Sequence, residues 1–210
     1  MSSSPPPSRA SSSLSSSSSS KRSISIRAAT IADSDAIAQI CLLTANQGYS
    51  AEKLLSHPDL PAHIGPLPYL YVPSGFGFVL TRRSRRRGGK QKVVGYIVGT
   101  AHSARFERET EANWWPIMRM RYPQDLAGTP LDRHFVGMLY KKQRELKAAQ
   151  EELPVQLHVT VLEKYQRWGC DRLLVEVALR HLRTQGFLGC LKSNDDSDTE
   201  SDTSHETIRS

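Results

Sequence analysis

The pattern of hydrophobic and polar positions divides the chain into a polar leader, a folded body and a polar tail. Thirteen of the first 20 residues are Ser, and the last 18 residues hold one large apolar residue, Ile208. Such segments cannot bury enough apolar surface to fold. We predict a disordered leader at residues 1–22, one domain at residues 23–192 and a disordered acidic tail at residues 193–210.

Short apolar runs within the body predict β-strands. Residues 23–26 alternate polar and β-branched side chains, as a half-buried strand does. Residues 76–80 and 93–98 predict a hairpin, whose connecting loop is rich in Arg and Lys and therefore solvated. Residues 155–162 show the strongest strand pattern in the chain, and residues 187–191 fit one more short strand.

Helical patterns alternate with these strands. Thr30 and Asp33 resemble a capping box, which predicts a helix that buries Ile37, Ile40, Cys41 and Thr44 and ends at Gly48. Residues 58–73 contain five prolines and predict a long ordered loop. Further helices are predicted at residues 51–56, 105–121, 131–150 and 172–183, the last with Leu173, Leu174, Val177, Ala178 and Leu182 on its inner side. This order of elements predicts an α/β fold with a mixed, mostly antiparallel sheet flanked by helices.

Composition narrows the functional classes. The longest near-unbroken apolar run, residues 93–98, is far below the ~20 residues of a membrane span, so a transmembrane protein is excluded. The net charge is +7, and the body is more basic than the whole chain because most of the tail's charges are acidic. A basic body suits a polyanionic partner, either a phosphate-bearing cofactor or a nucleic acid.

The three cysteines, Cys41, Cys170 and Cys190, form neither a disulfide framework nor a zinc-binding spacing. We therefore expect a reducing compartment and no metal. The Ser-rich leader has the composition of a transit peptide but no apolar face to place on a membrane. This favours a cytoplasmic location and leaves the nucleus and the mitochondrion open.

The turn between the strong strand and the helix after it is the most specific candidate site. Gly169 lets backbone N–H groups approach an anion, and the helix N-terminus adds the positive end of its dipole. Arg167 and Arg172 could add charge-assisted hydrogen bonds, so the segment suits a pyrophosphate. An ordinary strand-to-helix turn explains the same residues equally well.

A family resemblance bears on this turn. Residues 157–174, LHVTVLEKYQRWGCDRLL, resemble the acetyl-CoA-binding strand, loop and helix of the GNAT superfamily of N-acetyltransferases, whose loop reads Q/R-x-x-G-x-G/A. The segments ICLLT, PYL, VGYIVG, WWP and RYP, in this order along the chain, resemble the GNAT branch related to the acetyltransferase-like domain of O-GlcNAcases. The similarity runs from about Ile24 to Leu191 and implies the GNAT acyl-CoA N-acyltransferase fold.

The resemblance implies an N-acetyltransferase that transfers an acetyl group from acetyl-CoA to an amine, which is a small molecule or a protein lysine. In this family the pantetheine lies along the strand and the pyrophosphate lies on the loop amides. The implied cofactor-binding residues are Val159, Val161, Gln166, Arg167, Trp168, Gly169, Cys170, Asp171 and Arg172. His158 and Glu163 are candidate general bases, although a strand His is more often a core residue and a carboxylate at a strand end is usually solvated.

Two features depart from the GNAT pattern. Asp171 stands where the family has Gly or Ala and puts a carboxylate against a diphosphate, unless it turns away to cap the helix. GNAT domains also continue past the strand at residues 187–191 with a further helix and strand, where this chain has an acidic tail. We therefore expect a C-terminally incomplete, self-associating domain of weak activity. The alternative is a non-catalytic GNAT-fold binding module that has lost the cofactor site.

Other candidate sites are less specific. Trp114 and Trp115 are more typical of a core than of a substrate groove. His57 and His63 lack a third ligand nearby, so we assign them no metal. The basic loop at residues 81–92 has no aromatic residue for base stacking, so neither nucleic acid nor a membrane is an expected partner.

Overall fold

The computed structural model describes residues 24–83, 91–148 and 155–187, with the backbone alone for residues 142–148. The predicted leader and tail, most of the basic hairpin loop and all but Phe187 of the last predicted strand lie outside these residues. The expectation that a C-terminal helix and strand are missing also concerns residues outside the described ranges. None of the described helices is long and apolar enough to cross a membrane.

Four strands form one sheet in the order β1 (Ile24–Ala28), β2 (Gly75–Arg83), β3 (Gln91–Thr100) and β4 (Gln156–Val161). All three pairings are antiparallel, with a register shift between β2 and β3 at Leu80 and Thr81. β3 is buried over most of its length because both faces of the sheet are covered. β4 forms one edge of the described sheet.

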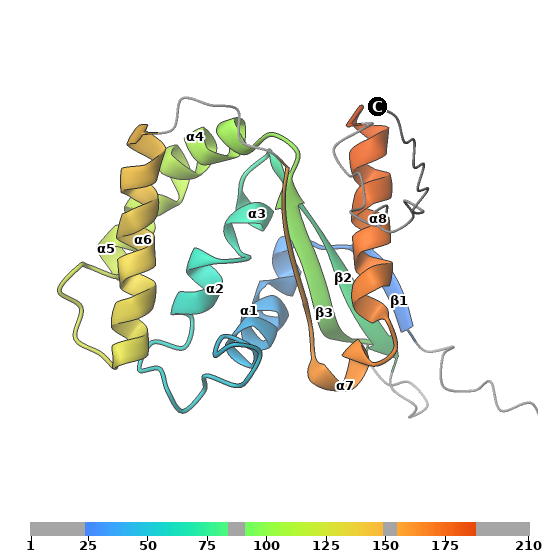
Figure 1. Ribbon diagram of the computed structural model, residues 1–210, viewed down its shortest axis with the longest axis horizontal. Helices are drawn as coiled ribbons and strands as arrows, with labels where there is room; N and C mark the ends of the chain where they lie inside the picture. The colour runs from blue at the N-terminus through green and yellow to red at the C-terminus, as the bar shows by residue number, and fades with distance from the viewer. Residues whose placement is uncertain (1–23, 84–90, 149–154, 188–210) are drawn as a thin grey trace, which may run out of the picture.

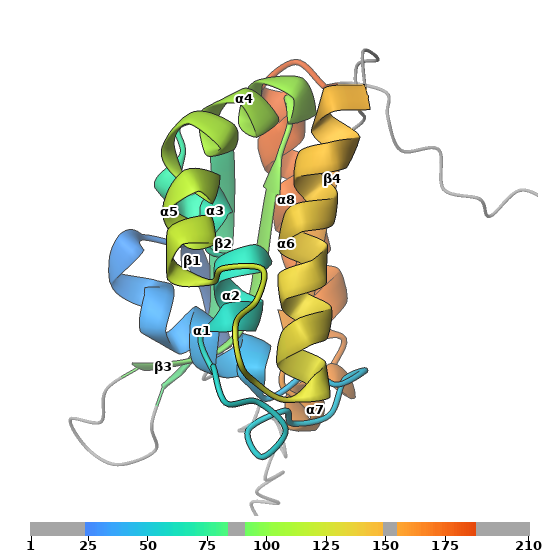
Figure 2. The same ribbon diagram turned by 90° about the vertical axis from the view of Figure 1, so that its left-hand side faces the viewer.

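Helices cover the two faces of this sheet unequally (Figure 1). The helix α8 (Cys170–Thr184) covers one face, where Leu174 and Ala178 pack against Ile97 and Val161. The other face carries η2 (Ile31–Asp33), α1 (Ser34–Leu42), α2 (Leu60–Ile64), α3 (Pro68–Tyr71), α4 (Ser103–Asn113), α5 (Trp115–Arg121) and α6 (Pro130–Ala148). α2 lies between α1 and α6 in both views (Figures 1 and 2).

The predicted capping box is present at the entry to the first helices. The Thr30 N–H donates to Asp33 Oδ2 at 2.9 Å, and the Asp33 N–H donates to the Thr30 carbonyl. α1 ends earlier than predicted, at Leu42, and Leu42 is buried where Thr44 was expected to be. Cys41 is half-buried.

Two predictions for the following segment are wrong. Residues 51–56 form turns rather than a helix, because the Asp132 carboxylate accepts the backbone N–H groups of Ser56 and His57 at 3.0 and 3.1 Å. The Pro-rich stretch is not a loop throughout but contains α2 and α3. Pro61 and Pro68 lie in the first turns of these helices, where a missing N–H costs nothing.

The predicted helix at residues 105–121 is two helices, α4 and α5, which meet at Trp114. Pro116 cannot donate to a carbonyl of the preceding turn, and the helix breaks at this point. The helices predicted at residues 131–150 and 172–183 are confirmed as α6 and α8 over their described residues. On α8, Leu173 is exposed rather than buried.

Candidate functional site

Among the described residues, β4 pairs with β3 alone, so the other side of its backbone has no partner strand there, and we term this side the open edge. The Leu162 N–H donates to the Val94 carbonyl on β3 at 3.0 Å. Alternate residues of an antiparallel pair direct both backbone groups to the partner strand. Every second residue before Leu162, that is Thr160, His158 and Gln156, therefore also directs its backbone N–H and C=O groups to β3. Val159 and Val161 lie between these residues, and their N–H and C=O groups face the open edge.

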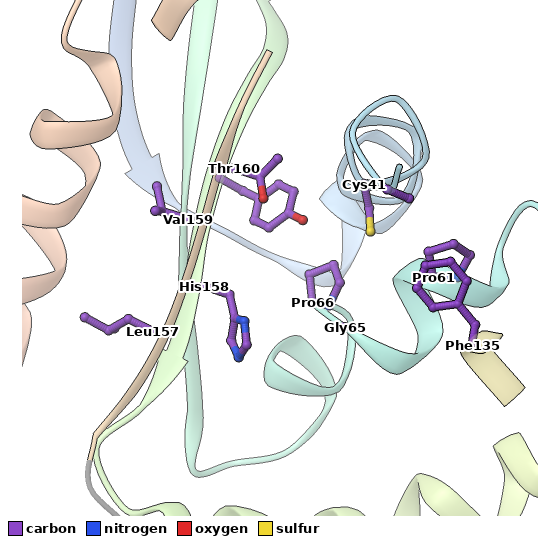
Figure 3. Close-up of a pocket in the computed structure, with 11 residues that line it drawn as sticks. Cys41, Pro61, Gly65, Pro66, Phe135, Leu157, His158, Val159 and Thr160 are labelled. Atoms are coloured by element: carbon purple, nitrogen blue, oxygen red, sulfur yellow. The ribbon is translucent and has the colours of Figure 1, made fainter. Parts of the chain in front are cut away.

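Side chains of β4 alternate between the two faces of the sheet. Figure 3 shows His158 and Thr160 on one side of the strand and Leu157 and Val159 on the other. His158 and Thr160 line a cavity of about 440 Å³, which we term the β4–α2 cavity. Its other walls are Cys41, Ala45, Pro61, Gly65, Pro66, Tyr96, Phe135, Leu157 and Val159.

A second cavity, of about 390 Å³, lies where the chain leaves β4 and enters α8, and we term it the β4–α8 cavity. Val159 and Thr160 bound both cavities, so the two adjoin along β4. The remaining lining residues are Thr44, Gly48, Val161, Gln166 and Asp171.

The turn into α8 has the conformation that the sequence predicts. α7 (Glu163–Gln166) follows β4, and Gly169 is the N-cap of α8 with φ 66° and ψ 26°. No atom lies within 4 Å of the position that a Cβ would take, so the left-handed backbone alone favours glycine here. The first amides of α8 have no carbonyl one turn earlier in the helix, which leaves donors and a positive dipole end for an anion.

The polar side chains around this turn have different roles. Gln166 Nε2 donates to the Val161 carbonyl at 2.8 Å, so this side chain occupies an acceptor on the open edge of β4. Arg167 and Arg172 are exposed beside the helix N-terminus. Trp168 is 44% exposed, and its ring meets the buried Tyr165 ring edge-on at 5.5 Å between centroids.

Asp171 does not cap the helix that it starts. The N-cap is Gly169, no side-chain cap hydrogen bond is present, and the Asp171 side chain is exposed at the β4–α8 cavity. Cys170 is 1% exposed and lies in the core beneath α8. Burial, followed by the neighbouring Asp171 carboxylate, raises the pKa of its thiol, so Cys170 offers the site only its backbone.

His158 belongs to a hydrogen-bonded chain at the β4–α2 cavity. The Tyr69 hydroxyl donates to Gln156 Oε1 at 3.0 Å and lies 3.1 Å from His158 Nε2. The Tyr69 hydroxyl therefore connects the Gln156 side chain to the His158 ring. Tyr69 is 3% exposed and stacks on Phe106 with centroids 4.2 Å apart, which fixes this chain in place.

The remaining candidates from the sequence lie elsewhere. Glu163 is exposed on α7 and lines neither cavity. Trp114 and Trp115 are core residues, and the indole N–H of Trp114 donates to the His63 carbonyl. His63 lies 2.8 Å from the Tyr122 hydroxyl rather than in a ligand set. Among residues 24–83, 91–148 and 155–187, no group of three or more His, Cys, Asp or Glu could hold a metal ion.

Sequence reasoning missed Tyr69, Gln156 and the wall residues Pro66 and Phe135. One signal was present in Gly99. A Cβ at Gly99 would collide with the Gln156 carbonyl, so this glycine allows the close approach of β3 and β4 that places Gln156 beside Tyr69.

Comparison with known proteins agrees with this architecture. No model of a protein family matches the chain. The crystal structure of SsHAT is similar to it with a TM-score of 0.64 and 29% sequence identity, over 78% of this chain and 79% of SsHAT. With the antiparallel sheet flanked by helices, this similarity shows an α/β, acetyltransferase-like fold of the GNAT type, as predicted.

Proposed function

We propose that the chain is an N-acetyltransferase that transfers an acetyl group from acetyl-CoA to an amine. The observation that carries the proposal is the arrangement of β4 and α8. A strand with no partner on one side among the described residues leads, through α7, to a helix N-terminus preceded by a left-handed glycine. The proposal includes the branch of the family, for which the segments resembling the acetyltransferase-like domain of O-GlcNAcases are the support.

The residues at the edge of β4 fit an extended, amide-containing cofactor. The outward N–H and C=O groups of Val159 would pair with the pantetheine amides. The Val161 N–H would do so as well, whereas Gln166 already engages the Val161 carbonyl. The first amides of α8, with Arg167 and Arg172 beside them, would hold the diphosphate.

The β4–α2 cavity would receive the acceptor amine. Acetyl-CoA supplies the acetyl group as an activated thioester. His158 projects into this cavity next to Val159. It would take the proton that the amine loses as the amide bond forms, while the thioester C–S bond would break and CoA would leave as its thiolate. Tyr69 and Gln156 would hold the ring in position at the cavity. Glu163, the other candidate base, lies on α7 away from both cavities.

Asp171 favours the second candidate function, a non-catalytic module with the same fold. An exposed carboxylate at the β4–α8 cavity opposes a diphosphate. In that case the basic body of the chain would bind another partner.

Calorimetry with acetyl-CoA and an acetyl-transfer assay separate the two functions. We expect Arg172→Ala to weaken cofactor binding by about tenfold or more, since a hydrogen bond to a charged group contributes roughly 1.5–3 kcal/mol. Arg183→Ala, in the last turn of the same helix, is the matched control and should leave the affinity unchanged. If calorimetry detects no binding heat with millimolar acetyl-CoA, the proposed enzyme function is contradicted and the non-catalytic binding module is supported.

Loss of the base is tested separately. His158→Asn should lower kcat by about a hundredfold, the lower end of the range for general bases, and leave the affinity for acetyl-CoA unchanged. Glu163→Gln should leave both quantities unchanged. The reverse result would move the base to Glu163.

A further inference from the structure

The β4–α2 cavity has walls that are almost free of charge. On the side facing β4 lie Pro61, Pro66 and Phe135, all apolar (Figure 3). Ala45, also apolar, lines the cavity as well. Among the described residues that line it, none is Asp, Glu, Lys or Arg. A volume of about 440 Å³ with mostly apolar walls and a few polar groups is typical of a small-molecule site.

The thiol and the phenol that line the cavity are held neutral. Burial raises the pKa of the Cys41 thiol to about 11, and its hydrogen bond with Tyr96 opposes that rise only in part. Burial also raises the pKa of the Tyr96 hydroxyl, which hydrogen-bonds to Thr160 as well. At neutral pH these side chains therefore offer hydroxyl and thiol groups but no counter-ion for a cation.

Resting on the N-acetyltransferase function, we propose that the acceptor is a small primary amine with a compact apolar body, alkyl or aryl. Such an amine buries its apolar body against Pro66 and Phe135 and places its nitrogen beside His158. It enters the reaction as the neutral amine, which is also the nucleophilic form.

Polyamines and protein lysines fit these walls less well. A polyamine brings further ammonium groups into the cavity, where none of the described lining residues offers a carboxylate to compensate their desolvation. A lysine side chain is a narrow methylene chain that leaves the space between Pro66 and Phe135 unfilled, which forfeits dispersion contacts. The net charge of +7 also repels lysine-rich peptides.

An acceptor panel tests the proposal on the full chain. We expect kcat/KM for 2-phenylethylamine and 3-methylbutylamine to exceed the values for spermidine and a lysine-containing peptide by about tenfold or more, about 1.4 kcal/mol of preference. Calorimetry with 2-phenylethylamine and spermidine, without acetyl-CoA, measures the same preference independently of transfer. A preference for spermidine or the peptide, or no heat with 2-phenylethylamine, overturns the acceptor class.

A charge placed in the wall gives the second test. Ala45 lines the cavity and is half-buried, so Ala45→Asp adds a carboxylate there and Ala45→Asn is the neutral control of the same shape. We expect Ala45→Asp to raise the ratio of kcat/KM for pentane-diamine to kcat/KM for pentylamine by about tenfold. Ala45→Asn should leave this ratio unchanged. Thermal melting verifies that both variants fold, and if Ala45→Asp does not, the panel on the unaltered chain decides.

Failure of this inference differs from failure of the enzyme itself. Acetyl transfer to the peptide with none to the apolar amines refutes the acceptor class and retains the N-acetyltransferase. Binding of 2-phenylethylamine without acetyl-CoA binding or transfer supports the cavity chemistry and refutes the enzyme.

Discussion

Asp171→Asn should tighten acetyl-CoA binding while making the protein less stable. The carboxylate is exposed at the β4–α8 cavity, so its repulsion of a diphosphate about 4 Å away acts through water-like dielectric and amounts to about 1 kcal/mol. Removing it should lower the Kd by about fivefold. Asp171 also lies in the first turn of α8, where an acid stabilises the helix dipole by about 0.5 kcal/mol. The Tm should therefore fall by about 1–2 °C.

Calorimetry at two ionic strengths and thermal melting measure the two effects. The gain in affinity should shrink at high salt, because the charge is exposed and screened. Asp35→Asn is the matched control, since Asp35 is an exposed acid in the first turn of α1. It should lower the Tm similarly and leave the Kd unchanged. An unchanged Kd for Asp171→Asn would refute the placement of the diphosphate at the N-terminus of α8.

Two further predictions concern residues that support the site and the fold. Tyr69→Phe should lower kcat by about three- to tenfold with the KM for acetyl-CoA unchanged, because it removes one hydrogen bond to His158 and keeps the ring stack. Tyr71→Phe in the same helix is the control, and an equal loss of kcat there would contradict the role of Tyr69. The Arg27 guanidinium, with the Thr30 N–H, lowers the pKa of Asp33 from 3.8 to about 2. The ionised carboxylate therefore stabilises the fold above about pH 4, and this contribution disappears as the pH falls towards 2. Asp33→Asn should lower the free energy of unfolding by about 1–2 kcal/mol at pH 7, after allowance for solvent screening of Arg27. When the free energy of unfolding is measured against pH, the variant should lose less of it below pH 4 than the unaltered chain does.

The elements with strong periodicity were predictable from the sequence. Residues 155–162 alternate too strongly for anything but a strand, and Gly169 marks the turn into α8. The failures arose where a distant residue decides the local structure. Residues 51–56 have a helical pattern, but Asp132, 75 or more positions away, accepts the backbone N–H groups of Ser56 and the adjacent His57.

The proposed cofactor side of the candidate site is contiguous in sequence, which is why a sequence motif could suggest it; its residue roles stay predictions. All of its residues lie between Val159 and Arg172, so one motif contains them. The β4–α2 cavity is assembled from α1, α2, β3, α6 and β4, and its polar chain joins Tyr69 to residues almost 90 positions later. No local pattern encodes such a meeting, and the prolines that form part of its wall predicted only a loop.

The alternation of β4 explains how one strand can serve both cavities. The backbone N–H and C=O groups of Val159 and Val161 face the open edge of β4. The side chains of His158 and Thr160, at the alternate positions, face the β4–α2 cavity. In the proposed enzyme, Val159 would therefore contact the cofactor and His158 would accept a proton side by side, without competing for the same groups. A one-residue slip in the pairing of β3 with β4 would move His158 to the α8 face and turn the Val159 backbone towards β3. The collision that a Cβ at Gly99 would have with the Gln156 carbonyl shows how closely the two strands approach in the observed register. The register of this single pair of strands thus determines whether the cofactor edge and the acceptor cavity meet.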